Sequence, residues 1–286
     1  MSVYQSVYYD IKTKKFTVFS NSINAKQYQQ LKRSCGILEI ALNEVDYYIM
    51  MLDNGYAFLQ DCKENEPGMP KNFIRSNRFV TNYLNSFYIW REYIRRHSFF
   101  GDISSALEPF DKTEVAKLGR VIRNYCVHEG VVITKMKSDL LNEQNAFYFD
   151  IKGILRKSKR LDEDIKKLLQ KYETSDLEAV SFVNSHIQHV ALMQSRVWHQ
   201  EWPVFISSLT NIKEYTPEGF PDCFNCSVVD SNGDRLLHTG RLLELLAQKQ
   251  QLLDEINPPI PINLAKSVYN IDIEPTCQSI ATITRT

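Results

Sequence analysis

The spacing of hydrophobic residues predicts a mainly helical chain. Along most of the sequence, apolar side chains recur at alternating steps of three and four residues, which is the period of an amphipathic helix. This pattern predicts helices over residues 28–52, 72–96, 111–129, 158–172, 176–198 and 240–256. Asn54-Gly55 is a candidate break after the first helix, and the loop at 62–71 is expected to make the first two helices antiparallel neighbours in a bundle. Asp111 or Thr113 is expected to cap the third helix, and Gly130 to end it.

A shorter, alternating pattern predicts a few β-hairpins beside the helices. Apolar and polar residues alternate on both sides of the lysine-rich turn at 12–15, which predicts a hairpin within residues 1–22. Two short strands are expected at 131–134 and 146–151. Asn232-Gly233 follows another apolar stretch and is a strong hairpin-turn sequence.

These elements predict the fold class, which is mainly α: a helical bundle with a few short β-hairpins. The expected organisation has four parts: a hairpin at 1–22, a helical bundle at 23–130, a helical extension packed on the bundle at 131–257, and an extended C-terminal tail at 258–286. Residues 99–109 are expected to be a connection. The tail, which follows a proline-rich stretch, is expected either to add an edge strand or to stay loose.

Composition narrows the classes of function. The 286 residues include 34 basic and 34 acidic side chains, so the formal net charge is zero. A protein dedicated to duplex nucleic acid usually carries a basic excess, so any nucleic-acid contact has to be local. No apolar run approaches the roughly 20 residues that span a bilayer, and we expect no signal peptide. The six cysteines are scattered without a disulfide-framework spacing. We therefore expect a cytoplasmic protein with reduced thiols and no membrane partner.

The most informative sequence runs from Arg120 to His128, at the end of the third predicted helix. At about 100° per residue, Arg120, Asn124 and His128 follow one another along the polar side, and Arg123 flanks them. The long guanidinium of Arg123 is expected to reach toward the imidazole of His128. Four apolar residues of the same helix share a narrow arc that we expect to be buried: Val115, Leu118, Ile122 and Tyr125.

These residue types suit metal-free cleavage of RNA. A histidine can take the proton of a 2′-hydroxyl or give one to the departing 5′-oxygen. An arginine can hold the phosphate and neutralise the charge that grows on it in the transition state, and an asparagine can orient the ribose or the imidazole. One histidine does not easily serve as both base and acid, so a symmetric dimer that pairs two such helices would supply the second set of groups.

The sequence Arg123-Asn124-Tyr125-Cys126-Val127-His128 resembles the Arg-(four to six residues)-His signature of the Higher Eukaryote and Prokaryote Nucleotide-binding (HEPN) family. A polar residue directly after the arginine, here Asn124, is also typical of that family. The resemblance covers roughly residues 27–130. It implies an all-helical, dimerising bundle and a metal-independent ribonuclease of a toxin–antitoxin or anti-phage defence system, with an antitoxin or defence-complex protein as a partner. It further implies that Arg123 and His128 are catalytic and that Asn124 supports them.

The sequence therefore predicts a homodimeric endoribonuclease that acts on RNA, uses neither cofactor nor metal, and leaves 2′,3′-cyclic phosphate and 5′-hydroxyl ends. Arg120 is either a substrate-binding residue or a plain surface charge. Two alternatives stay open: a non-catalytic HEPN-like module for dimerisation or binding, and a chain that binds or modifies nucleotides.

Other patterns favour structural roles. His186 and His189 lie three apart on a predicted helix without an evident third ligand, and Cys223-Phe-Asn-Cys226 is a lone cysteine pair. The acidic sequence 230–234 lacks the glycine and the acidic twelfth ligand of a calcium loop and is expected to be a turn. The basic sequence 91–97 either stabilises the end of its helix or, if it neighbours the motif helix, extends a phosphate-binding groove.

Overall fold

The computed structural model describes residues 4–64, 73–98, 102–139, 144–157, 161–218 and 225–257. Within these ranges the chain forms eight helices and six strands. The helices are α1 (Ala25–Glu64), α2 (Phe73–His97), α3 (Ser104–Asp111), α4 (Glu114–Glu129), α5 (Ile151–Lys157), α6 (Glu163–Ser175), α7 (Ala179–Lys213) and α8 (Thr239–Ile256). The strands are β1 (Tyr4–Asp10), β2 (Lys15–Ile23), β3 (Ile133–Asp139), β4 (Gln144–Phe149), β5 (Cys226–Val229) and β6 (Arg235–Leu237). The predicted mainly α fold with short hairpins is confirmed, and the tail expected at 258–286 lies outside the described residues.

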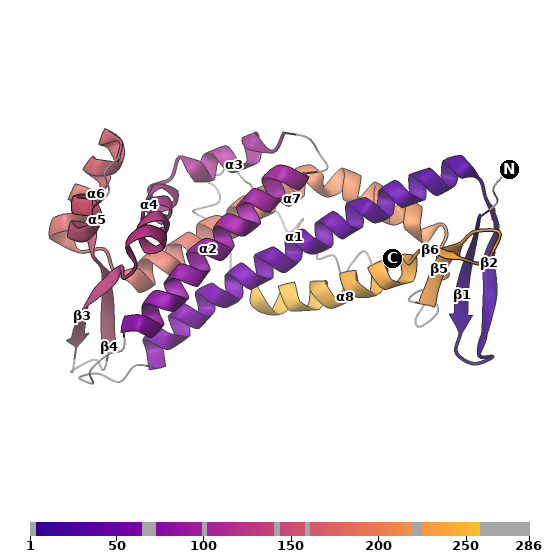
Figure 1. The fold of residues 1–286 in the computed structure, drawn as a ribbon, viewed down its shortest axis with the longest axis horizontal. Coiled ribbons are helices and arrows are strands. Elements are labelled where there is room, and N and C mark those ends of the chain that lie inside the picture. The colour runs from indigo at the N-terminus through magenta and orange to yellow at the C-terminus, as the bar shows by residue number, and fades with distance from the viewer. Residues whose placement is uncertain are drawn as a thin grey trace.

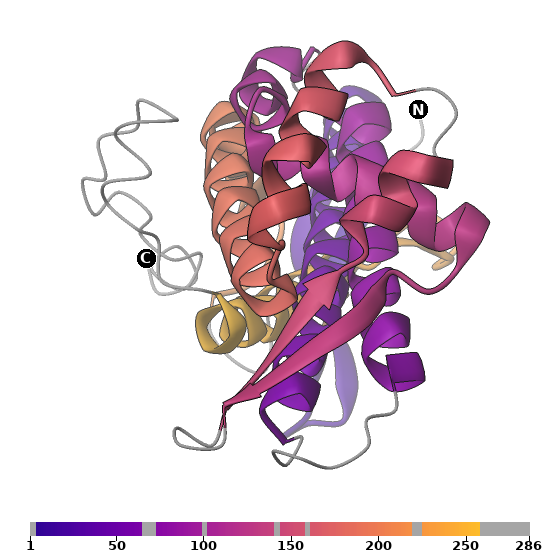
Figure 2. The same cartoon turned by 90° about the vertical axis from the view of Figure 1, so that its left-hand side faces the viewer.

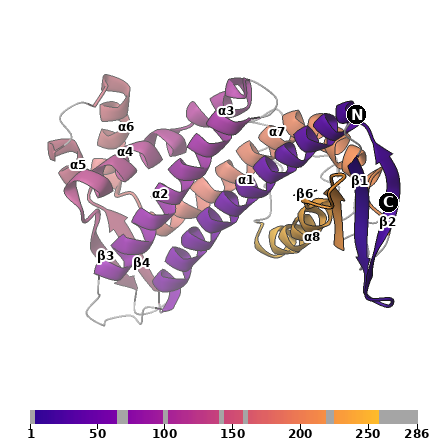
Figure 3. The same cartoon turned by 45° about the vertical axis from the view of Figure 1, so that its right-hand side comes forward.

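Three long helices, α1, α2 and α7, run along an elongated molecule (Figures 1 and 3). Helix α8 lies along α1 and α3 lies along α7, and the remaining elements lie toward the two ends. Strands β1, β2, β5 and β6 lie at one end, next to the start of α8. Strands β3 and β4 and helices α5 and α6 lie at the other end, which faces the viewer in Figure 2. Helix α4 lies near this second end (Figure 1).

Helix α1 continues through Asn54-Gly55, so the expected break is wrong. A Cβ atom at position 55 would lie 2.8 Å from Cδ1 of Ile187 in α7 and 3.0 Å from Cδ2 of Tyr83 in α2. The glycine therefore allows two other helices to approach α1 closely. Glycine lowers helix propensity by only about 1 kcal/mol, and packing of the buried residues on either side outweighs that.

Two further differences from the predicted elements concern α3 and α7. Residues 104–111 form a helix instead of a connection because one side of it is buried, namely Ala106, Leu107 and Phe110. Helix α7 does not end at 198 but runs through Pro203 to Lys213. Its last turns extend the core toward the sheet with three more buried residues: Phe205, Leu209 and Ile212.

The N-terminal and C-terminal hairpins form one antiparallel sheet with the strand order β2-β1-β5-β6. β1 pairs with β2 on one side and with β5 on the other, so the first strand of the chain lies beside a strand from its last quarter. The predicted turn at Asn232-Gly233 joins β5 to β6, and Gly233 adopts a φ of 84°, which glycine favours. One face of the sheet packs on α1, α7 and α8 through a core cluster that includes Leu31, Leu38 and Val228.

His186 connects α2, α4 and α7 in a second, larger core cluster. Its Nδ1 lies 2.7 Å from the hydroxyl of Tyr83, and its ring meets the rings of Phe87 and Phe110 edge-on. A Cβ atom at Gly119 would lie 2.8 Å from Nε2 of His186, so the glycine allows α4 to cross close to α7. Burial lowers the pKa of His186 to about 3, which keeps the imidazole neutral in the core.

A pair of buried carboxyl groups links α1 to α7. Oε1 of Glu44 accepts hydrogen bonds from Nε2 of Gln194 at 2.8 Å and from Nε1 of Trp198 at 3.0 Å. Burial, followed by the negative charge of Glu201, raises the pKa of Glu44 well above its ordinary value. Burial also raises the pKa of Glu201, whereas hydrogen bonds from Ser98 and Glu44 lower it. The proton that the two carboxyl groups share is therefore favoured on Glu44, from which Glu201 accepts a hydrogen bond.

We expect Gly119→Ala to destabilise the protein by about 1–3 kcal/mol, as overpacking of a filled core does. The new methyl group meets His186, which cannot retreat without leaving its hydrogen bond with Tyr83. Urea unfolding measures the change. The matched control is Gly36→Ala on α1, because a Cβ atom there meets nothing within 4 Å. This control should be neutral or stabilising by up to about 1 kcal/mol, and equal effects of the two substitutions would contradict the close crossing.

We expect Glu44→Gln to stabilise the protein increasingly as pH rises from 5 to 8. The unfolded chain loses this proton near its ordinary value of 4.5, whereas the folded chain keeps it to higher pH, so wild-type stability falls as pH rises above about 4.5. Glutamine reproduces the protonated form, since its oxygen accepts from Gln194 and Trp198 and its nitrogen donates to Glu201. The free energy of unfolding of the variant exceeds that of the wild type by about 1.4 kcal/mol for each unit by which folding raises the pKa of Glu44.

Urea unfolding at several pH values measures the difference in the free energy of unfolding between the variant and the wild type. The histidines titrate in both proteins, so their contribution cancels in this difference. The exposed Glu39 on α1 gives the control, and Glu39→Gln should parallel the wild type. Parallel stability curves for Glu44→Gln and the wild type would show that Glu44 is ionised in the folded chain.

Candidate functional site

Helix α4 carries the motif between two well-defined ends. The side-chain oxygen of Thr113 accepts a hydrogen bond from the backbone nitrogen of Ala116 at 3.1 Å, so Thr113 is the N-cap and Asp111 belongs to α3. Gly130 ends the helix with a φ of 93°, as expected for a glycine C-cap. The predicted buried arc is confirmed for Leu118, Ile122 and Tyr125, while Val115 is half-buried.

Four polar residues of α4 form what we call the polar ridge: Arg120, Arg123, Asn124 and His128. Arg120, Asn124 and His128 are exposed and succeed one another at one-turn intervals. Gly119 faces α7, and at about 100° per residue His128 lies on the opposite side of the helix, toward solvent. Arg123 lies only about 40° from Gly119 around the helix and is half-buried.

The guanidinium of Arg123 is turned toward α2 and not, as expected, toward His128. Its Nε donates to Oδ1 of Asn85 at 3.1 Å, and its Cζ lies 5.0 Å from the centre of the Tyr88 ring. Its Nη1 donates to Oδ1 of Asn124 at 3.3 Å. The direction follows from helix geometry, because positions 123 and 128 differ by about 140° around the axis and about 7.5 Å along it. The structure thus joins Arg123 to Asn124 and leaves His128 one turn beyond.

Tyr88 lies at the centre of an arginine cluster, which we define as Arg91, Arg120 and Arg123. Burial raises the pKa of the Tyr88 phenol, and the positive charges of Arg120, Arg91 and Arg123 act to lower it. The three guanidinium groups are therefore close enough to affect this ring electrostatically. Three guanidinium groups from α2 and α4 therefore gather near one ring, and Asp111, which pairs with Arg91, acts on it in the opposite direction.

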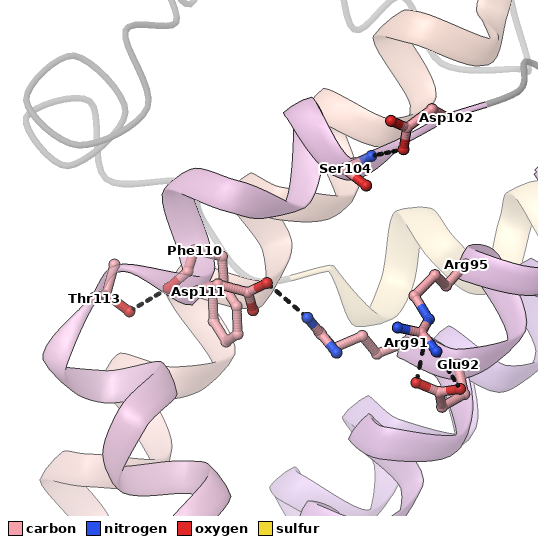
Figure 4. Close-up of polar contacts among 8 residues, drawn as sticks. All are labelled: Arg91, Glu92, Arg95, Asp102, Ser104, Phe110, Asp111 and Thr113. Atoms are coloured by element: carbon pink, nitrogen blue, oxygen red, sulfur yellow. Dashed lines mark hydrogen bonds and ion pairs between the residues drawn. The ribbon is translucent and has the colours of Figure 1, made fainter. Parts of the chain in front are cut away.

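Arg91 is the part of the basic sequence 91–97 that reaches the cluster. Its Nη2 lies 2.6 Å from Oδ2 of Asp111 at the end of α3 (Figure 4). Arg95 and Arg96 instead pair with Glu92 on the same helix, at 3.5 Å in both cases. Arg91 therefore lies near the motif helix, and extension of a phosphate-binding groove by this residue stays a prediction.

Among the described residues, Arg120 and Arg123 have no carboxylate partner. The partners of Arg123 are two amide oxygens and an aromatic ring, which fix the direction of the guanidinium without neutralising its charge. A guanidinium held in this way keeps its charge available to an anion, and planar, two-pronged contact with phosphate is its favoured mode.

Sequence reasoning missed Asn85 and Tyr88, which come from the second helix of the chain. Together with Arg91 they recur every three residues beside the buried stripe of α2. That spacing places them along one edge of the helix. A polar series beside an apolar stripe is what could have identified them, but only the fold shows that α4 lies against this edge.

The remaining candidate sites have structural explanations within the described residues. His186 bonds to Tyr83 in the core, and no group of three or more potential metal ligands occurs in the part of the chain that the structure describes. Asp230 accepts from the backbone nitrogens of Asn232 and Asp234 at 2.8 and 3.0 Å, which is a turn motif. Cys226 is buried 3.1 Å from Oγ of Ser6, and its predicted companion Cys223 lies outside the described residues.

None of the described helices combines the length and the apolar character needed to cross a bilayer. Comparison of the chain with protein-family models, with curated proteins and with solved structures gives no match. The assignment of a function therefore depends on the chemistry of the polar ridge and its surroundings.

Proposed function

We propose that this chain is a metal-independent endoribonuclease in which the polar ridge binds and cleaves the RNA backbone. The observation that carries the proposal is the Arg123 guanidinium, which is held by Asn85, Tyr88 and Asn124 but neutralised by no carboxylate among the described residues. The resemblance of residues 123–128 to the HEPN signature supports the same reading.

Each ridge residue has a role that its position permits. Arg123 would hold the scissile phosphate and neutralise the charge that develops on it, because its direction is fixed before substrate arrives. Arg120, one turn away and exposed, would bind an adjacent phosphate of the same strand. Asn124 accepts from Arg123 and would orient the ribose.

His128 would move the protons of the reaction. Its exposed imidazole would take the proton of the 2′-hydroxyl, whose oxygen attacks the phosphorus, or give a proton to the departing 5′-oxygen. The products are a 2′,3′-cyclic phosphate and a 5′-hydroxyl. All these roles belong to protein side chains, so chelators should leave the activity intact.

A second copy of the chain would complete the site. One ridge offers one imidazole, and the about 140° between Arg123 and His128 directs His128 away from the phosphate that Arg123 would hold. A two-fold dimer would place the ridge of one copy beside that of the other and supply the missing acid or base. Val127 and Val131, which are 46% and 49% exposed beside His128, offer an apolar contact for such a dimer.

A role as toxin or anti-phage defence effector, with an antitoxin or defence-complex partner in the cytoplasm, rests on the HEPN resemblance. The alternative is a non-catalytic binding or dimerisation module. The contacts of Arg123 with α2 favour that alternative in one respect, because they also stabilise the bundle.

We expect Arg123→Ala and His128→Ala to reduce cleavage of single-stranded RNA by about 10²–10⁴-fold, since each removes charge stabilisation or proton transfer in the transition state. The assay follows labelled RNA in the presence of a chelator and identifies the product ends. Exposed residues of the same types provide matched controls, and Arg33→Ala on α1 and His199→Ala on α7 should retain wild-type rates.

Folding of the variants is checked by urea unfolding. Arg123→Ala should cost about 1–3 kcal/mol, the loss of two hydrogen bonds and one cation–π contact. Unchanged cleavage by either variant would refute the catalytic assignment. Intact RNA after prolonged incubation with the wild type would instead favour the non-catalytic module.

We expect the chain to be a dimer in solution and Val127→Asp to convert it to monomers, because a charge at an apolar contact is costly to bury. Light scattering after size-exclusion chromatography measures the mass. Exposed Ile74 on α2 provides the control, and Ile74→Asp should remain dimeric. A monomeric wild type would remove the second imidazole from the mechanism.

A further inference from the structure

A cavity of about 410 Å³ opens at the sheet end of the molecule, far along the long axis from α4 (Figure 1). Its walls include Tyr9 of β1, Phe16 of β2, Ser227 of β5 and Arg235 of β6, followed by His238 and Arg241 at the start of α8. We call it the hairpin cavity. Its volume lies within the range of about 300–1,000 Å³ that is usual for small-molecule sites.

Three residues that line the cavity share the face of the sheet opposite to the core residue Val228, and the start of α8 completes the lining. Tyr9 and Phe16 are direct partners in the β1–β2 register, and Ser227 is the partner of Val7, two residues before Tyr9. Side chains two apart along a strand share a face, so Tyr9, Phe16 and Ser227 lie together. Val228, the next residue of β5, belongs to the core on the other face.

The charge around the cavity is positive. Arg235, Arg241 and His238 are the ionisable side chains of basic type in its walls, and no carboxylate is among the described residues that line it. Arg241 pairs with Glu244 at 2.7 Å on the exposed surface of α8, while the guanidinium of Arg235 lies 4.9 Å from the centre of the Phe16 ring. These groups favour an anion, with Arg235 oriented by a ring and not by an acidic partner.

The start of α8 adds to this preference. His238 is the N-cap of the helix, but its side chain makes no capping hydrogen bond. Instead its Nδ1 lies 3.4 Å from Oγ of Ser227, which holds the imidazole at the cavity wall. The first backbone N–H groups of a helix attract anions, and here an 18-residue helix begins beside two arginines.

The wall that adjoins Arg235 is aromatic. The rings of Tyr9 and Phe16 lie 5.3 Å apart in an edge-to-face arrangement, and the Phe16 side chain is 55% exposed. An exposed ring beside an oriented guanidinium is a stacking surface for a planar group. The two walls therefore suit the two ends of one molecule, an anionic end at Arg235, Arg241 and α8, and a planar end at Phe16.

We infer that the hairpin cavity is a binding site for a small aromatic phosphomonoester of about mononucleotide size. The phosphate lies against Arg235, Arg241 and the start of α8, and the ring stacks on Phe16. This site is separate from the polar ridge and does not require it to be catalytic.

Isothermal titration calorimetry on the full chain tests the proposal with uridine 5′-monophosphate, uridine and inorganic phosphate. We expect the monophosphate to bind at least tenfold more tightly than either fragment, because each fragment meets one wall only. Arg235→Ala and Arg241→Ala should each weaken it at least tenfold. Phe16→Ser should weaken the monophosphate by a larger factor than inorganic phosphate, because it removes the stacking surface as well as the ring that orients Arg235.

Arg78→Ala on α2 is the matched control, since it removes an exposed guanidinium outside both the hairpin cavity and the polar ridge and should leave this binding unchanged. If the monophosphate does not bind at millimolar concentration, if uridine binds equally well, or if both arginine variants bind like the wild type, the proposal is wrong. Circular dichroism establishes that the variants are folded, which their positions at the surface favour. Loss of binding on Arg123→Ala alone would assign the monophosphate to the polar ridge instead.

Discussion

The close contact between Gly119 and His186 determines which way the polar ridge faces. Tyr83 holds the imidazole of His186 in the core, and α4 can approach it only where a residue lacks a Cβ atom. This contact fixes the rotation of α4 about its own axis. Arg123 is then directed to α2, and His128 to solvent on the opposite side. A rotation by one residue, about 100°, would separate Arg123 from Asn85 and turn another side chain into the core.

In a chain of zero net charge, two arginines far apart on the molecule are oriented by neutral groups. Arg123 is oriented by amide oxygens and an aromatic ring, and Arg235 of the hairpin cavity is also oriented by a ring. Elsewhere basic residues meet acidic ones, as Arg95 and Arg96 meet Glu92. Within the two surfaces Arg91 pairs with Asp111 and Arg241 with Glu244, whereas Arg123 and Arg235 are held by neutral groups. Local arrangement therefore matters more than total charge for the binding of anions.

The sequence predicted most of the elements because the buried stripes of the helices are regular and their ends carry recognisable residues. Thr113 and Gly130 bound the motif helix as the cap rules require. The sequence did not predict that α1 continues through Gly55 or that α7 continues through Pro203, because both depend on burial against other helices. Periodicity placed the polar ridge on the surface of α4. It could not show that Arg123 meets Asn85 and Tyr88, because contacts between helices far apart in sequence follow from tertiary packing.

Two buried ionisable groups, His186 and Glu44, make the stability of the fold depend on pH in opposite directions. His186 stays neutral because burial lowers its pKa to about 3, so its contribution to stability is full above about 6.5 and declines as pH falls toward 3. Glu44 stays protonated because burial raises its pKa, so its contribution is full below about 4.5 and declines as pH rises. Between these limits the two trends oppose each other. The helices that position both proposed anion-binding surfaces thus enclose a core in which burial disfavours the charged forms of His186 and Glu44.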